Sequence, residues 1–190
     1  MAETATGLMT PEEFFVWERG RDGLYELVDG VPVPHVKMMT GASVRHDRVV
    51  VNIIIALGNK LRGARCQPTT DDIALRTKIR TIRRPDVTVD CGPLAPDSHE
   101  SGEPKLVVEV LSPSTTDIDR FRKLEEYKLH PTLAYILLVE TRAAKAILYR
   151  RGAQGWESEP YEGLEATIAL SEIGTDLAMA EIYQGLPLDQ

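Results

Sequence analysis

A single carboxylate interrupts the most apolar stretch of the chain. Glu109 lies between Val107-Val108 and Val110-Leu111, and burying a carboxylate is costly unless a cation or hydrogen-bond donors meet it. Asp86 is the natural second acid, because it follows Arg84-Pro85 at the start of another predicted strand. If the two strands lie side by side, both carboxylates reach one end of a sheet and form an oxygen-rich site suited to Mg²⁺ or Mn²⁺.

The same two acids also have a purely structural interpretation. Glu109 could pair with an interior Arg or Lys, and Asp86 could simply cap a turn. Spacing alone leaves both interpretations open.

The strands that must position these acids are predicted from their hydrophobic patterns. A central strand is indicated at Lys105–Leu111, which is almost continuously apolar. Further strands are predicted at Asp86–Asp90 and Leu133–Val139. A helix from Asp117 to about Leu129, ended by the following proline, lies between the two buried strands in the sequence.

The remaining elements place these strands in one mixed domain. They are a helix at Thr10–Trp17, a hairpin at Tyr25–Val33 that turns at Asp29-Gly30, a helix at Ser43–Leu61, strands of period two from Asp71 to Ile79, strands at Ala144–Arg150 and within Trp156–Leu170, and a short helix near Leu177–Tyr183. This order predicts an α/β (α+β) fold with a mixed central sheet flanked by helices. We expect a single domain over 1–190, with a core over about 10–150 and C-terminal strands and a short helix over 151–190.

The composition excludes several classes of protein. The 190 residues carry 22 Lys and Arg against 29 Asp and Glu, which gives a net charge of −7. No apolar run reaches the roughly 20 residues of a membrane span and the N-terminus has no secretory pattern, so we expect a cytoplasmic protein. No glycine-rich phosphate loop is present, so no nucleotide cofactor is expected. Cys66 and Cys91 lack metal-ligand spacing and are interpreted as buried thiols.

One segment has the charge needed to contact a polyanion, because it contains no acid. Its basic residues are Arg76, Lys78, Arg80, Arg83 and Arg84. Because Arg76, Lys78 and Arg80 alternate, they would share one face of a strand and, together with Arg84, could follow the phosphates of a nucleic acid. An ordinary exposed hairpin face has the same pattern. The tail from Trp156 onward repels phosphate, since it carries eight acids and no Lys or Arg.

Taken in order, these motifs resemble the pattern of the Uma-type restriction-endonuclease-like family, a branch of the PD-(D/E)XK nuclease superfamily. The resemblance spans about Thr10 to Ile147 and is carried by Tyr25–Gly30 (YELVDG), His46 early in a helix, Arg84–Val87 (RPDV), Val107–Thr115 (VVEVLSPST) and Lys123–Tyr127 (KLEEY). It implies a restriction-endonuclease-like mixed sheet flanked by helices, with a metal site on two neighbouring strands.

The resemblance also assigns roles to individual residues. Asp86 and Glu109 match the two metal-binding acids of the motif. The standard motif has a lysine two residues after the second acid, but position 111 is Leu here. Lys123 on the following helix is the residue that would replace this lysine, although a lysine on a helix is usually just solvated. Two other basic residues of that helix are alternatives, Arg120 and Lys128.

Two further residues recur in the family pattern. Glu26 is implied as a third carboxylate that reaches the metal or its water, and His46 as an accessory donor or proton-transfer group. Their structural alternatives are a hairpin carboxylate paired with an arginine and a histidine at the edge of the core.

The resemblance therefore implies a Mg²⁺-dependent or Mn²⁺-dependent endonuclease that hydrolyses phosphodiester bonds of duplex DNA. A homodimer is expected, because cutting both strands usually takes two sites. Two alternatives stay open: a catalytically inactive relative that binds a nucleic acid or a protein, and a hydrolase of small nucleotide substrates.

Overall fold

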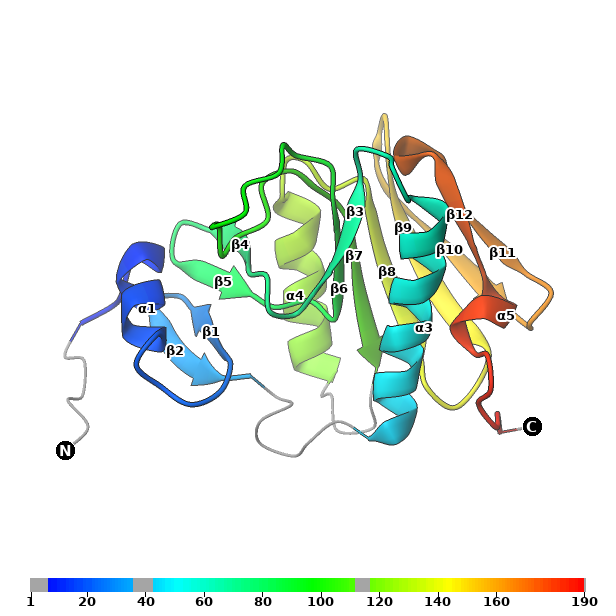
Figure 1. Ribbon diagram of the computed structural model, residues 1–190, viewed down its shortest axis with the longest axis horizontal. Helices are drawn as coiled ribbons and strands as arrows, with labels where there is room; N and C mark the ends of the chain where they lie inside the picture. Colours follow the sequence, from blue (N-terminus) through cyan, green and yellow to red (C-terminus); the bar gives the residue numbers. More distant parts are fainter. Residues whose placement is uncertain (1–6, 36–42, 112–116, 190) are drawn as a thin grey trace.

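The computed structural model describes residues 7–35, 43–111 and 117–189. Its centre is a six-stranded sheet in the order β10-β9-β8-β7-β6-β3 (Figure 1). The strands are β3 (Gln67–Thr70), β6 (Val87–Asp90), β7 (Pro104–Leu111), β8 (Tyr135–Glu140), β9 (Lys145–Gly152) and β10 (Gly155–Glu162). β7 and β8 run parallel, whereas the other neighbouring pairs run antiparallel. The predicted mixed central sheet is confirmed.

Helix α4 (Asp117–Leu129) connects the two parallel strands and covers one face of the sheet. Parallel neighbours need such a crossover, because the chain must return to the end at which the first strand began. Val107 and Leu111 of β7 pack against Leu124 and Tyr127 of α4. Glu109 lies between these two strand residues and has the same side-chain parity, so it faces α4 as well.

Helix α3 (Val44–Lys60) covers the opposite face of the sheet. Its apolar residues recur at helical spacing and pack against the alternate residues of β7, including Val108 and Val110. The C-terminal part completes this layer with β11 (Thr167–Leu170), the 3₁₀ turn η1 (Ser171–Ile173), β12 (Thr175–Ala178) and α5 (Met179–Ile182). The predicted last helix is confirmed, but β12 before it was not expected.

A second sheet lies on the far side of α4, in the order β2-β1-β5-β4 (Figure 1). It consists of β1 (Tyr25–Val28), β2 (Val31–Pro34), β4 (Leu75–Lys78) and β5 (Thr81–Arg83), with α1 (Pro11–Glu18) packed beside β1. Leu75 of β4 joins the core cluster of Leu124 and Tyr127. Helix α4 is therefore enclosed between the two sheets.

The predicted ends of the early elements are confirmed by their local chemistry. Thr10 and Glu13 form the expected capping box of α1. The hairpin turns at Asp29 and Gly30, which both have positive φ angles, 49° and 86°; Asp-Gly suits this type I′ turn. Ser43 caps α3 by accepting a hydrogen bond from the backbone N–H of His46. Within the described parts of the chain, no helix is long and apolar enough to cross a membrane.

Two expectations about strands are wrong. No strand was predicted at Gln67–Thr70, because this polar segment contains Pro68; its position at the edge of the sheet explains why a proline is tolerated. Arg76, Lys78 and Arg80 do not share one strand face. β4 ends at Lys78, Arg80 lies in the turn to β5, and the pairing register shifts between Arg76 and Lys78.

The expectation of two buried thiols is also wrong, because Cys66 and Cys91 form a disulfide. The antiparallel pairing of β3 with β6 sets Gln67 opposite Asp90. The two cysteines are the next residues outward on these strands and therefore face each other. Without β3, the sequence gives no reason to pair cysteines 25 positions apart.

Candidate functional site

Asp86 and Glu109 lie at the same end of neighbouring strands. β6 and β7 pair with Val87 opposite Val108, and one further step of this register sets Asp86 opposite Glu109. Asp86 Oδ2 accepts a 2.7 Å hydrogen bond from the backbone N–H of Val110. The two acids proposed from the sequence are thus neighbours across one strand pair.

His46 reaches Asp86 from the first turn of α3. Its Nε2 lies 3.5 Å from Asp86 Oδ2, and both side chains are buried. The other ring nitrogen, Nδ1, has no hydrogen-bond partner among the described residues. The structure therefore places His46 against the first acid of the motif, where it can orient that carboxylate.

Lys123 enters the site from α4. Its Nζ lies 3.1 Å from Glu26 Oε1 and 3.8 Å from Glu109 Oε1, and the side chain is only 9% exposed. A lysine buried to this degree is unusual unless carboxylates compensate its charge. The solvated-helix interpretation of Lys123 does not fit this position.

The residue at the usual motif position takes no part in this charge cluster. Leu111 has the same side-chain parity as Glu109 but packs in the apolar cluster with Leu124 and Tyr127. A lysine from the helix thus lies next to the second acid, while the strand position has become part of the core. Lys128, a proposed alternative, instead pairs with Glu125 at 2.9 Å.

Tyr127 is a member of the cluster that the sequence analysis missed. Its hydroxyl donates a 2.6 Å hydrogen bond to Glu109 Oε1. Burial raises the pKa of Tyr127 well above its ordinary value, so the hydroxyl stays protonated and remains a donor. Two signals were present in the sequence: Tyr127 closes the KLEEY motif, and it follows Lys123 by four residues on the same helix, which places both side chains on one face.

Glu109 is the most accessible acid of the cluster, and burial disfavours its charged form. Its side chain is 16% exposed, against 6% for Asp86 and 5% for Glu26. Burial raises the pKa of Glu109 to about 7; the Lys123 ammonium opposes this rise, and the charge of Asp86 adds to it. A cation bound beside Glu109 would favour its ionised form.

Glu26 is held on both oxygens. Its Oε2 accepts a hydrogen bond from Arg83 Nη1 at 2.8 Å, and its Oε1 lies 3.1 Å from Lys123 Nζ and 3.2 Å from the backbone N of Arg84. Burial by itself raises the pKa of Glu26, but the charges of Lys123 and Arg83 outweigh burial and hold the pKa at about 2. Glu26 is therefore a permanent anion at neutral pH.

Arg83 and Glu126 extend this cluster and were also missed from the sequence. Arg83 Nε and Nη2 donate to the two carboxylate oxygens of Glu126 at 2.7 and 3.1 Å. Both side chains are 2% exposed. In the sequence, an arginine inside a basic run looks like a solvated residue, and Glu126 lies within the KLEEY motif without a role assigned to it; the packing of α4 between two sheets reveals their pairing.

The donor set fits a hard divalent cation. Among the described residues, no three His, Cys, Asp or Glu side chains group closely enough to form a metal cage, so the site offers two carboxylates, Asp86 and Glu109. Mg²⁺ is commonly bound by one or two carboxylates while it keeps several waters. The raised pKa of Glu109 agrees with this fit, because a cation there would stabilise two neighbouring negative charges.

Three of the four residues proposed to contact nucleic acid, Arg84, Arg76 and Lys78, pair within the protein; Lys78 Nζ lies 3.3 Å from Glu126 Oε1. Arg84 is 4% exposed, and its guanidinium bonds to Glu18 and to the backbone oxygens of Tyr25, Asp71 and Asp72. Arg76 bridges two acids, Glu100 at 2.9 Å and Glu12 at 2.8 Å.

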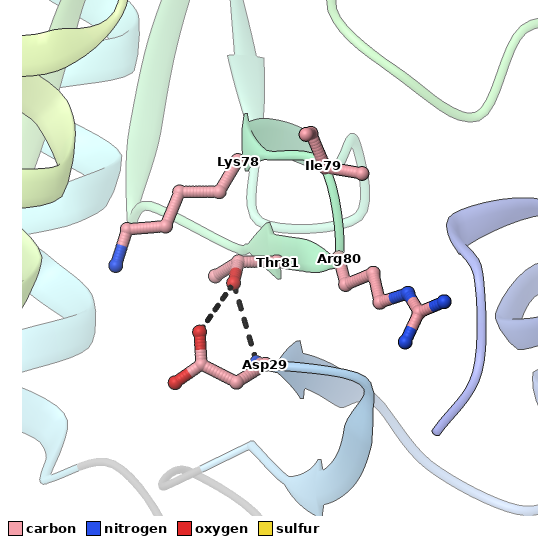
Figure 2. Close-up of a pocket in the computed structure, with 5 residues that line it drawn as sticks. All are labelled: Asp29, Lys78, Ile79, Arg80 and Thr81. Atoms are coloured by element: carbon pink, nitrogen blue, oxygen red, sulfur yellow. Dashed lines mark hydrogen bonds between the residues drawn. The ribbon is translucent and has the colours of Figure 1, made fainter. Parts of the chain in front are cut away.

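Lys78 and Arg80 lie at the tip of the small sheet and are exposed. They line an open pocket of about 400 Å³ with Asp29, Ile79 and Thr81. Figure 2 shows that these two side chains extend in opposite directions. Asp29 lies below Thr81 in this view, and the Thr81 hydroxyl bonds to both its backbone N–H and its carboxylate. Both side chains are exposed, but Lys78 Nζ already pairs with Glu126, so Arg80 is the more available of the two to an external anion.

Fold and site together define the class. A mixed sheet flanked by helices carries a strand-borne acid pair with a lysine beside it, which is the arrangement of restriction-endonuclease-like proteins. The model of the Uma2 family, described as "Putative restriction endonuclease", matches residues 11–180. The chain belongs to this family.

Two similar proteins extend over nearly the whole chain. "Uncharacterized protein slr1290" of Synechocystis sp. is 32% identical over 181 residues, which are 94% of this chain and 93% of the relative. The crystal structure of "a putative nuclease belonging to DUF820" from Anabaena variabilis superposes with a TM-score of 0.71 at 12% identity. It covers 92% of this chain and 97% of the other, and at this identity the likeness supports the fold.

Proposed function

We propose that this protein is a metal-dependent nuclease that hydrolyses phosphodiester bonds in duplex DNA. The observation that carries the proposal is the approach of Lys123 Nζ to Glu109 Oε1, at 3.8 Å, beside the strand partner Asp86. The Lys123 ammonium supplies the positive charge that Leu111, at the usual lysine position of the motif, does not. The Uma2 family and the Anabaena protein are both described as nucleases, which supports the same role.

The roles of the residues follow from their positions. Asp86 and Glu109 would hold Mg²⁺ or Mn²⁺, which supplies Lewis-acid stabilisation of charge on the phosphate oxygens and lowers the pKa of a water. Lys123 would add a second fixed positive charge next to the scissile phosphate. His46 would orient Asp86 through its Nε2. The metal ion and the Lys123 ammonium would place positive charge where the reaction develops negative charge.

Substrate contacts outside the centre would come from the tip of the small sheet. Arg80 is exposed there, and Lys78 could contact a phosphate in exchange for its ion pair with Glu126; such contacts would make binding weaken as salt concentration rises. The acidic tail from Trp156 onward would repel DNA from the opposite end of the chain. We also propose a homodimer, because two sites are usually needed to cut both strands.

The test is a Mn²⁺ titration by calorimetry, followed by plasmid cleavage with the same samples. We would compare wild type, Asp86→Asn/Glu109→Gln, and the surface control Asp97→Asn/Glu165→Gln. Saturable binding and nicking in wild type and control, both lost in the site variant, are expected. Absence of saturable binding in wild type would overturn the proposal and favour a non-catalytic binding module. Cleavage of short oligonucleotides but not of plasmid would favour a small substrate.

A further inference from the structure

The buried charge cluster has two parts that differ in the elements that carry them. Asp86 and Glu109 face the place where a cation would bind, whereas Glu26, Arg83 and Glu126 lie behind Lys123, between α4 and the small sheet. Glu26 was expected to reach the metal. Its two oxygens already bind cationic or N–H groups of the protein, so a metal ion would have to displace Arg83 or Lys123 to reach it.

Arg83 connects this second part into one rigid unit. Its Nη1 donates to Glu26, while its Nε and Nη2 form a fork with Glu126. Paired donors of this kind fix the direction of a carboxylate as well as its distance. Arg83 and Glu126 are each only 2% exposed, so solvent has little access to these bonds.

The unit acts on Lys123 from two directions. Glu126 follows Lys123 by three positions, so the two side chains lie on the same face of α4, and anchoring Glu126 fixes the rotation of the helix. Glu26 attracts the ammonium group directly at 3.1 Å. The ammonium is thereby held between Glu26 and Glu109, at 3.8 Å from the latter, and does not collapse into a close ion pair with Glu109.

We infer that Glu26, Arg83 and Glu126 form a positioning unit for Lys123 and that Glu26 is not a metal ligand. The inference rests on the proposed function, since it assigns these residues to the geometry of the same site. Glu26 keeps the Lys123 ammonium from forming a close ion pair with Glu109, so that Glu109 can bind the cation and the ammonium is held at a fixed position beside it.

Metal affinity in a lysine-free background separates positioning from ligation. We would compare Lys123→Ala with Lys123→Ala/Glu26→Gln by Mn²⁺ calorimetry. If Glu26 acts only through Lys123, the two dissociation constants agree within about twofold. If Glu26 binds the metal, its removal weakens Mn²⁺ binding by about tenfold or more, as loss of a group that supports a metal site does. That weakening would overturn the inference.

Cleavage kinetics test the positioning role in the otherwise intact enzyme. Glu26→Gln and Arg83→Lys should each lower kcat by about 100-fold, because small displacements of a charged group from the reacting atoms have effects of this size, while KM for DNA stays nearly constant. The matched control is Glu100→Gln, which breaks the Arg76 pair of the same sheet without touching Lys123. Its kcat should equal that of wild type.

The outcomes distinguish failure of the inference from failure of the function. Wild type that neither binds Mn²⁺ nor cleaves DNA overturns both. Active wild type with an unchanged kcat in folded Glu26→Gln and Arg83→Lys overturns the positioning unit alone. Circular dichroism at the assay temperature establishes whether each variant is folded. Because Glu26→Gln and Arg83→Lys change different residues, the test can still be decided if one of them does not fold.

Discussion

Tyr127 and Lys123 both approach the same atom, Glu109 Oε1, at 2.6 and 3.8 Å. They come from successive turns of α4, so one helix face supplies both a neutral donor and a cation to the second acid of the motif. The neutral donor fixes the direction of the carboxylate, and the cation compensates its charge. This division makes separate predictions for the two residues.

Replacing Tyr127 by Phe keeps the buried ring and removes the hydroxyl. Glu109 then loses its hydrogen bond and its ionised form becomes less favourable, so Mn²⁺ affinity at neutral pH should fall by about 1 kcal/mol, or roughly fivefold. Calorimetry measures this change, and urea unfolding should show a modest loss of stability. A Mn²⁺ affinity equal to that of wild type would mean that Glu109 does not need the Tyr127 hydroxyl to bind the metal.

Replacing Lys123 by Ala should abolish cleavage while Mn²⁺ binding persists, because the lysine is not a metal ligand. Moving the lysine back to the strand provides the sharper test. Leu111→Lys in the Lys123→Ala background places an ammonium two residues after Glu109, on the same face of β7. It should restore measurable nicking, at some cost in core packing. Persistent cleavage by Lys123→Ala alone would contradict the assignment.

Replacing Glu109 by Gln should abolish Mn²⁺ binding with little loss of fold, since the side chain keeps its size and a half-buried charge disappears. Calorimetry and thermal unfolding at pH 7 are the paired measurements. A variant that unfolds would indicate a structural carboxylate, and one that binds Mn²⁺ normally would exclude Glu109 as a ligand.

The pKa of Glu26 predicts a component of acid unfolding. The group titrates near its ordinary pKa of 4.5 in the unfolded chain and at about 2 in the folded protein. A lowered folded pKa stabilises the protein above pH 4.5, and this contribution is lost as pH falls from 4.5 to 2. It amounts to about 3 kcal/mol at most. Urea unfolding of wild type and Glu26→Gln across this range should show a flatter pH dependence for the variant; parallel curves would contradict the ion pairing.

The disulfide should stabilise the fold by restricting the unfolded chain. Cys66 and Cys91 close a loop with a sequence separation of 25, for which chain entropy predicts about 3 kcal/mol. Urea unfolding of wild type and Cys66→Ser/Cys91→Ser should differ by about this amount without reductant and converge once wild type is reduced. Two titratable thiols in the unreduced, unfolded protein would show that the bond does not form.

The central acids and the helix lysine were proposed from the sequence on different grounds, and only Glu109 breaks a local rule. Glu109 interrupts an apolar strand, Asp86 begins a strand after Arg-Pro, and the resemblance pointed to Lys123. Arg83 and Glu126 break no such rule, since a strand arginine and a helix glutamate are ordinary at a surface. Their burial depends on the second sheet covering α4, which is a tertiary property. The same holds for β3, whose polar residues form a strand only because β6 offers an edge.

The enclosure of α4 also has a consequence for how the chain acquires its site during folding. Glu26 and Arg83 come from the small sheet, Asp86 and Glu109 from the strands of the large sheet, and Lys123 from the helix between them. The decisive contacts therefore join residues distant in sequence, and they form only when both sheets have docked. A sub-global opening that detaches the small sheet would leave the larger core folded but dismantle the charge cluster. Hydrogen exchange at β1 and β5 would then report the fraction of molecules in which the charge cluster is assembled.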